Sequence, residues 1–136
     1  MCAVCGDALG KDEHSLKIII VGDGKVGFTL AEHLSQEEHD VTVIDTNDEA
    51  LRHASDALDV MCVKGNGASV SALEESGVHS ADVVIAATNL DEVNMVCCLT
   101  AKRLGAKYTI ARVRNVEYAM ELSLLKEALG IDLVIN

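Results

Sequence analysis

A glycine-rich turn between a predicted strand and a predicted helix limits the possible folds of this chain more than any other feature. The turn is Gly22-Asp23-Gly24-Lys25-Val26-Gly27, and it follows the apolar run at residues 17–21. In such a unit the first glycine permits a tight turn, the second lets backbone approach a pyrophosphate, and the third lets helix and strand pack closely. The free N–H groups at the start of the helix favour an anion. The motif therefore predicts the first βαβ unit of a dinucleotide-binding fold.

A second predicted strand, at residues 41–45, ends in an acid that fits this fold. Asp45 lies 18 positions after Gly27 (45 − 27), close to the roughly 20 expected for the acid that binds a ribose. We expect Asp45 to accept hydrogen bonds from ribose hydroxyls and to repel a 2′-phosphate. This favours NAD(H) or an adenosine nucleotide over NADP. The alternative is a carboxylate that only caps a turn or a helix.

Segments of strand and helix character alternate along the chain. Strands are predicted at residues 17–21, 41–45, 59–63, 82–87, 108–113 and 132–135. Helices are predicted from Val26 to Leu34, from a cap at Asn47 through Ala54, from Ser69 to Ser76 before Gly77, from Asp91 to Leu104 before Gly105, and from a cap at Asn115 to Gly130. This alternation predicts an α/β fold of the Rossmann type, a doubly wound, six-stranded parallel sheet with strand order 3-2-1-4-5-6.

The composition supports a buried parallel sheet and restricts the classes of function. Aromatic residues make up 2% of the chain and hydrophobic residues 49%, so the core must be aliphatic, as in a sheet covered on both faces. A net charge of −11 disfavours binding to nucleic acid or to anionic membranes. No apolar run is long enough for a membrane span, so no direct membrane insertion is predicted. We predict one nucleotide-binding domain at residues 16–136, after a leader or disordered segment at residues 1–15.

The cysteines indicate a reducing compartment. Cys62, Cys97 and Cys98 lie in apolar stretches, where cysteine behaves as a small hydrophobic residue of a cytoplasmic protein. A C-x-x-C pair at residues 2–5 could form part of a zinc site with His14. Because no second close pair follows, we predict no metal site. A redox or metal sensor remains a further interpretation of that pair.

The candidate binding residues follow the predicted strands, because ligands of a doubly wound sheet bind outside the carboxyl ends of its strands. They are Gly22, Asp23, Gly24, Lys25, Val26 and Gly27 after the first strand, Asp45 and Thr46 after the second, Gly65 and Asn66 after the third, Ala87, Thr88 and Asn89 after the fourth, and Arg112 in the fifth.

Several of these assignments have structural alternatives. Gly65 and Asn66 could belong to an ordinary loop, and Thr88 and Asn89 could cap the next helix. Arg112 is uncommon in an aliphatic strand, so it either pairs with an acid or meets a ligand phosphate. No catalytic residue is predicted, because none of the five histidines is placed as a general acid beside a cofactor.

Six motifs within residues 17–136 occur together in one known family. They are Ile18–Gly27, Asp40–Asn47, Gly65–Ser69, Ala81–Thr88, Asp91–Met95 and Ile110–Asn115. With these motifs the chain resembles the RCK N-terminal domain, also called the KTN or TrkA-N domain. The D-E-x-N after the fourth strand and the A-R-V-R-N at the fifth are the specific signals. Many members have G-D-A-T where this chain has Gly65-Asn66-Gly67-Ala68, and most continue into a C-terminal domain.

The resemblance implies a regulatory subunit or domain of a membrane potassium transporter, and not an enzyme. Such a protein is cytoplasmic, peripheral to the inner face of the cell membrane, and assembles as a homo-oligomer of dimers and rings. It binds NAD or NADH, with ATP/ADP as the alternative, in the glycine-turn crevice. The resemblance also implies a phosphate contact for Arg112, and assembly contacts and ligand support for Asp91, Glu92 and Asn94. The alternative function is the cofactor-binding half of an NAD-dependent oxidoreductase.

Overall fold

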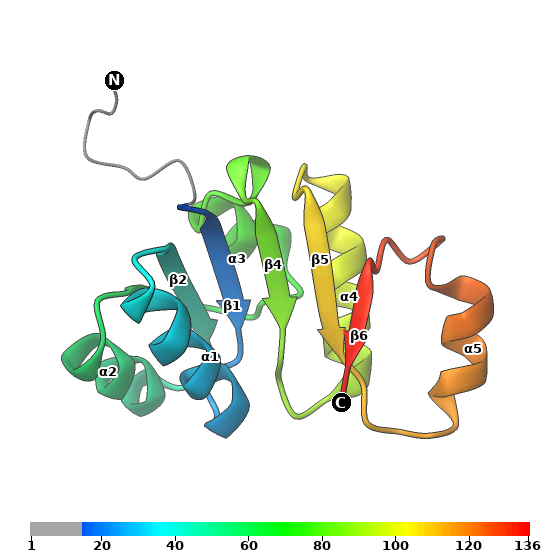
Figure 1. Cartoon of the computed structure of the whole chain (residues 1–136), viewed down its shortest axis with the longest axis horizontal. Coiled ribbons are helices and arrows are strands. Elements are labelled where there is room, and N and C mark those ends of the chain that lie inside the picture. Colours follow the sequence, from blue (N-terminus) through cyan, green and yellow to red (C-terminus); the bar gives the residue numbers. More distant parts are fainter. Residues whose placement is uncertain (1–14) are drawn as a thin grey trace.

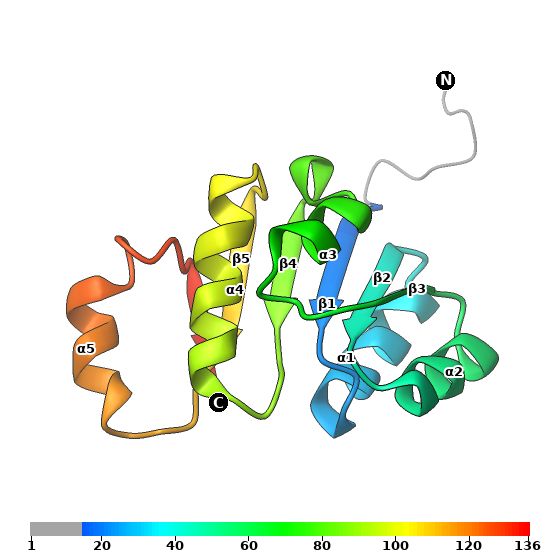
Figure 2. The same cartoon turned by 180° about the vertical axis from the view of Figure 1, so that it is seen from behind.

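The computed structural model describes residues 15–136, which form one parallel sheet with helices on both faces (Figure 1, Figure 2). The strands are β1 (Lys17–Val21), β2 (Asp40–Asp45), β3 (Met61–Lys64), β4 (Val83–Ala86), β5 (Tyr108–Arg112) and β6 (Leu133–Ile135). The helices are α1 (Lys25–Gln36), α2 (Asp48–Ala57), α3 (Val70–Glu75), the 3-10 helix η1 (Val78–Ser80), α4 (Asp91–Arg103) and α5 (Tyr118–Leu125). The C-x-x-C pair, His14 and all but the last residue of the predicted leader lie outside the described residues.

The strand order is β3-β2-β1-β4-β5-β6, and every pair of neighbours is parallel. This confirms the predicted doubly wound sheet. The order reverses between β1 and β4, so the loops after these two strands diverge at the carboxyl edge of the sheet. The structure therefore opens a crevice where the candidate residues were expected.

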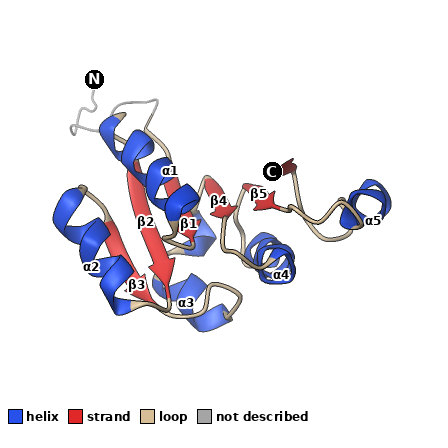
Figure 3. Ribbon diagram, turned by 90° about the horizontal axis from the view of Figure 1, so that it is seen from below, coloured by secondary structure: helices blue, strands red, loops and turns tan. Residues whose placement is uncertain are grey.

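Each face of the sheet has its own apolar core, because successive strand residues point to opposite faces. Helices α1 and α2 cover one face, and α3 and α4 cover the other (Figure 3). On β1, Ile18 and Ile20 belong to the first core, and Ile19 and Val21 to the second. The all-aliphatic composition therefore reflects a sheet that is buried from both sides.

The cysteines of α4 are part of the second core, as predicted. Cys97 and Cys98 are fully buried. Burial raises the pKa of both thiols above the ordinary value, and the pKa of Cys98 reaches about 12. Both therefore remain uncharged and act as small hydrophobic residues.

Several predicted boundaries differ from the observed ones, among them the following three. Strand β3 was expected to begin at Asp59, but its pairing with β2 begins at Met61, opposite Thr42. The last helix was expected to run to Gly130, but α5 ends at Leu125 and the chain continues in turns. Asn115 does not cap this helix: its side chain accepts the N–H of Glu117, the residue that precedes α5, and so closes a turn.

Candidate functional site

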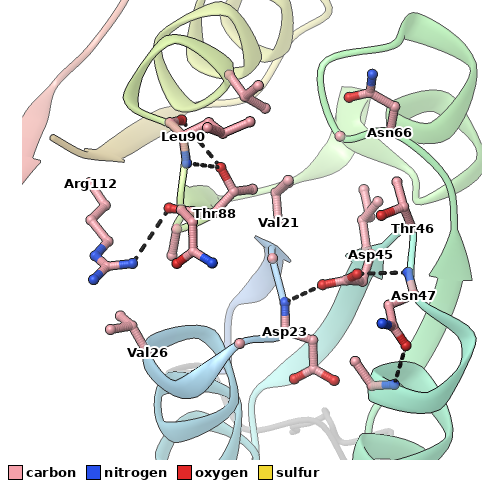
Figure 4. Close-up of a pocket in the computed structure, with 18 of the residues that line it drawn as sticks. Val21, Asp23, Val26, Asp45, Thr46, Asn47, Asn66, Thr88, Leu90 and Arg112 are labelled. Carbon is pink, nitrogen blue, oxygen red and sulfur yellow. Dashed lines mark hydrogen bonds between the residues drawn. The ribbon is translucent and has the colours of Figure 1, made fainter.

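A cavity of about 410 Å³ lies at the carboxyl ends of the strands, where β1 and β4 diverge (Figure 4). This volume is typical of a small-molecule site. All predicted site residues except one line it, namely Gly22, Asp23, Gly24, Lys25, Val26, Asp45, Thr46, Gly65, Asn66, Ala87, Thr88, Asn89 and Arg112. Seven more residues line it: Gly67, which belongs to the Gly65–Ser69 motif, and Val21, Ile44, Asn47, Ala50, Leu90 and Val93, which sequence reasoning missed. Most of these seven are apolar or small, and their residue types carry no chemical signal.

The three motif glycines have different environments. Gly22 has a φ of +100°, and a Cβ there would lie 2.9 Å from the backbone nitrogen of Thr88. A Cβ at Gly27 would lie 1.7 Å from the carbonyl oxygen of Gly22, so Gly27 permits helix packing and does not line the cavity. A Cβ at Gly24 would meet nothing within 4 Å. Gly24 is thus the motif glycine whose missing side chain leaves open space at the mouth of α1.

The N-terminus of α1 is left open to an anion. Its cap residue, Gly24, makes no side-chain capping bond, and the first turn of α1 has no acidic residue. Helix α2 differs, because Asn47 accepts two N–H groups there and Asp48 and Glu49 follow. The free N–H groups and the positive end of the α1 dipole therefore remain available at the cavity.

Asp45 is held by backbone donors. Its Oδ2 accepts the N–H of Asp23 at 2.6 Å, and its Oδ1 accepts the N–H of Asn47 at 2.8 Å. Asp45 therefore stabilises the turn, as the alternative interpretation of this carboxylate predicted. Because a carboxylate oxygen has two lone pairs, each oxygen can still accept a further hydrogen bond from a ligand in the cavity.

Asp23 carries a buried carboxylate that lacks partners. The residue is 7% exposed, and neither carboxylate oxygen has a hydrogen-bond partner. Burial, followed by the charge of Asp45, raises the pKa of Asp23 from 3.8 to about 6, against the lowering effect of His53. Such a perturbed acid at a cavity is typical of a functional site.

Replacing Asp23 by asparagine is expected to stabilise the protein at neutral pH. The folded state holds the proton more tightly than the unfolded state, so the free energy of unfolding falls as the pH rises from 3.8 to about 6. Asp23→Asn removes the charge, so its free energy of unfolding at neutral pH should exceed that of the wild type by on the order of 1–3 kcal/mol. Urea denaturation of both proteins at several pH values measures this difference, which should vanish below the ordinary pKa of aspartate. A variant less stable than the wild type at neutral pH would contradict the expectation.

Arg112 lies across the cavity from Asp45 (Figure 4). Its Nη1 donates to the carbonyl oxygen of Thr88 at 3.4 Å, and its buried Nε has no partner. The ion pairs within residues 15–136 do not include Arg112. The alternative of an acid partner is therefore not realised in this part of the chain, and the guanidinium retains unused donors beside the cavity.

Thr88 shapes the loop after β4. Its Oγ1 accepts the N–H of Leu90 at 3.2 Å and donates to Oδ1 of Asn94 at 2.7 Å. The residue that caps α4 is Leu90, which makes no side-chain capping bond. The capping alternative for Thr88 and Asn89 is therefore wrong, because Thr88 closes a turn that ends at the cap residue Leu90, two positions later.

Asn94 joins the ends of two strands, a role that the sequence analysis did not assign. The residue is fully buried, and its Oδ1 accepts the N–H of Thr88 at 2.9 Å. Its Nδ2 donates to the carbonyl oxygens of Thr88 at 3.1 Å and of Arg112 at 2.7 Å. The loop after β4 and the end of β5 are thus fixed by one amide. The available signal was its position, because Asn94 shares a helix face with Cys98 and Ala101.

Asp91 holds the loop after β5 in a similar way. Its carboxylate accepts the N–H of Arg114 at 3.1 Å and the N–H of Asn115 at 2.8 Å. Arg114 itself does not line the cavity, because its side chain donates to the carbonyl oxygen of Asn89. The two motifs that are specific to the resembled family are therefore in contact, since D-E-x-N binds the backbone of A-R-V-R-N.

The loop after β3 is an ordered turn that packs against β1. Oδ1 of Asn66 accepts the N–H of Ala68 at 2.9 Å. A Cβ at Gly67 would lie 2.0 Å from Cγ1 of Val21. The loop can therefore pack this closely against Val21 of β1 only because residue 67 has no side chain.

Metal ligands do not cluster in this part of the chain. Within residues 15–136 there is no group of three or more histidine, cysteine, aspartate or glutamate side chains that could hold a metal ion. The C-x-x-C pair lies outside these residues, so the interpretation of that pair as a zinc or redox site stays untested.

Comparisons with known proteins agree with this fold. The TrkA-N domain model matches residues 18–136. The Trk system potassium uptake protein TrkA of Halomonas elongata is 46% identical over 123 residues, which are 89% of this chain and 27% of that protein. The GsuK channel bound to NAD is 25% identical with a TM-score of 0.74, over 92% of this chain and 22% of the channel chain. GsuK bound to ADP is 25% identical with a TM-score of 0.73, over 92% of this chain and 32% of that chain.

The chain thus spans about a quarter of the length of the Halomonas TrkA protein. The family match extends over nearly all the described residues, and it includes the glycine turn and the loops after β4 and β5. The chain belongs to the TrkA-N domain family.

Proposed function

We propose that this chain is the nucleotide-sensing regulatory domain of a Trk-type potassium uptake system, with NAD(H) or ATP/ADP bound in the glycine-turn cavity. The observation that carries the proposal is the distribution of charge across the cavity. Acceptors at Asp45 lie on one side, and the donors of Arg112 lie on the other (Figure 4). A nucleotide has the complementary arrangement, with ribose hydroxyls at one end and anionic phosphates at the other.

The phosphates of the ligand would lie at the mouth of α1. The open space at Gly24 admits them without a steric conflict, and the uncapped helix offers its N–H groups. Arg112 would add charge-assisted hydrogen bonds from the other side, through donors that have no acid partner in the described chain. The structural neighbours support a nucleotide as the ligand, because GsuK has been solved with NAD and with ADP.

The ribose next to adenine would lie against Asp45. A carboxylate there accepts two ribose hydroxyls and repels a 2′-phosphate, so NADP should bind less well than NAD. The same chemistry suits the ribose of ATP or ADP. Asp45 therefore supports an adenosine nucleotide as the ligand class. It does not discriminate between NAD(H) and ATP or ADP, which differ in the part of the molecule beyond this ribose.

A regulatory role fits the cavity better than catalysis. In the part of the chain that the structure describes, no histidine, cysteine or serine lines the cavity. The residues that do line it can bind and orient a nucleotide, and hydride transfer would in addition require a substrate site with a proton-transferring group. Names of relatives support the same role, because the matched TrkA protein belongs to a potassium uptake system.

Regulation would act through assembly beside a membrane transporter, on the cytoplasmic side of the membrane. Within residues 15–136, none of the helices has the length and apolar character needed to cross a membrane. Three apolar side chains spaced four residues apart are largely exposed: Val116, in the turn before α5, at 85%, and Met120 and Leu124 of α5 at 76% and 80%. Such a stripe favours contact with another protein surface, which suits a homo-oligomer. A ligand that binds two assembly states with different affinity would shift their populations.

Calorimetric titration with NAD, NADH, ATP and ADP tests the proposal. We expect saturable binding of at least one of the four. Asp45→Ala should weaken that binding by on the order of 1–3 kcal/mol, because charge-assisted hydrogen bonds to the ribose are lost. The matched control is Asp48→Ala, since Asp48 is exposed, pairs with Lys64 and does not line the cavity. No heat with any of the four nucleotides would contradict the proposal, and equal binding by the Asp45 variant would remove Asp45 from the site.

A further inference from the structure

The carboxylate of Asp23 makes no hydrogen bond, although the residue lies inside the glycine turn. It is 7% exposed, both of its oxygens lack hydrogen-bond partners, and its residue lines the cavity. An unpaired buried charge is destabilising. We propose that Asp23 couples nucleotide binding to proton uptake, so that the site binds its ligand most tightly when this side chain is protonated. The inference rests on the proposed function and adds a regulation of the same site.

The surroundings of Asp23 come from four elements. Asp45, at the end of β2, accepts the backbone N–H of Asp23 and places a second carboxylate close to the first. His53 of α2 favours the ionised form of Asp23. Burial, followed by the charge of Asp23, raises the pKa of Cys62 of β3. Helix α1 contributes Phe28, whose ring stacks on His53 with centroids 4.8 Å apart. One acid and one imidazole thus act on Asp23 in opposite directions, and the acid has the larger effect.

A bound nucleotide would make ionisation of Asp23 still less favourable. Asp23 directly precedes Gly24, where the ligand phosphates are proposed to lie, so a second anion would approach the carboxylate. The ligand would also cover the turn and remove what contact with water remains. Like charge and loss of solvent both raise the pKa of a carboxyl group. The bound state would therefore hold a proton at pH values where the free state has lost it.

The sign of the pH dependence follows from linkage. The pKa of Asp23 without ligand is raised to about 6. Below this value the side chain is already protonated, and ligand binding takes up no proton. Above it, binding must restore the proton, so affinity falls as the pH rises, by up to about tenfold per pH unit until the pKa of the bound state is reached.

The experiment uses NAD as the probe, because no group of NAD titrates between about pH 5.5 and about pH 8, whereas the terminal phosphates of ATP and ADP do. Calorimetry in buffers of different ionisation enthalpy counts the protons taken up on binding. We expect net proton uptake near pH 7, and a dissociation constant that rises about tenfold from pH 5.5 to pH 8. Asp23→Asn should show no proton uptake and the same dissociation constant throughout, with circular dichroism as the check on its fold.

His53→Gln is the matched control, since His53 is exposed and does not line the cavity. The variant should retain the pH dependence and move it to higher pH, because His53 lowers the pKa of Asp23. If the wild type binds NAD measurably but takes up no proton, the inference is overturned and the proposed function stands. A pH dependence that survives in Asp23→Asn, or disappears in His53→Gln, would overturn it as well. Absence of NAD binding at every pH would instead overturn the proposed function on which the inference rests.

Discussion

Gly24→Val should lose nucleotide binding by more than about 100-fold while the protein stays folded. The backbone at Gly24 has φ −81° and ψ −159°, which any residue can adopt, and a Cβ there meets nothing within 4 Å. The valine side chain would instead fill the space proposed for the pyrophosphate, and it would block the N–H groups of α1. A loss of this size, about 3 kcal/mol, corresponds to one or two missing charge-assisted hydrogen bonds.

Two further variants, one at Gly24 itself and one at Gly27, make this test more specific. Gly24→Ala adds a single carbon and should lose less affinity than Gly24→Val. Gly27→Val should fail to fold, because its Cβ would lie 1.7 Å from the carbonyl oxygen of Gly22. Calorimetry measures the affinities, and thermal denaturation followed by circular dichroism measures the fold. Undiminished affinity in a folded Gly24→Val protein would rule out the proposed position of the pyrophosphate.

The fold and the cavity could be predicted from local patterns. The glycine turn, the aliphatic strands and the helix-ending glycines each act over a few residues, and together they permit one sheet order. Gly77, for example, was expected to end a helix, and its φ is +79°. Thirteen of the predicted site residues line the cavity for a topological reason, since the carboxyl ends of parallel strands meet at one edge.

What sequence reasoning missed depends on contacts between distant segments. Asp23 is buried and interacts electrostatically with Asp45, His53 and Cys62, which come from β2, α2 and β3, and the glycine motif itself does not encode these neighbours. The early end of α5 has a similar cause, because Leu122 is the only buried residue of that helix and packing therefore does little to extend it. Asn94 shows the intermediate case: the helix period predicts that it is buried, but not which carbonyl groups it meets.

The two family-specific motifs have a shared structural role in this chain. Asp91 and Asn94 lie one helical turn apart on α4, and both bind backbone at the end of β5 or just after it. The position of Arg112 beside the cavity therefore depends on α4 as well as on its own strand. This arrangement explains why residues so far apart in the sequence occur together, and it joins the proposed phosphate contact to the helix next to it.

Asn94→Ala is expected to lower the free energy of unfolding by on the order of 3 kcal/mol. The amide is fully buried and joins three backbone groups, the N–H and carbonyl of Thr88 and the carbonyl of Arg112. Truncation leaves the N–H of Thr88 and the carbonyl of Arg112 without this partner, while the carbonyl of Thr88 keeps only the long hydrogen bond from Arg112. Each buried group left unpaired costs about 1–3 kcal/mol. Nucleotide affinity should fall too, because the loop after β4 and the end of β5 lose the amide that fixes them.

Urea denaturation of Asn94→Ala and of its control, Asn89→Ala, measures the effect. Asn89 lies in the same loop region but is exposed, and the same substitution there should change stability by less than about 0.5 kcal/mol. Because both variants remove one carboxamide, their difference isolates the buried network from the loss of the side chain itself. Equal stability of the two variants would mean that water replaces the amide, and that Arg112 is held beside the cavity by β5 alone.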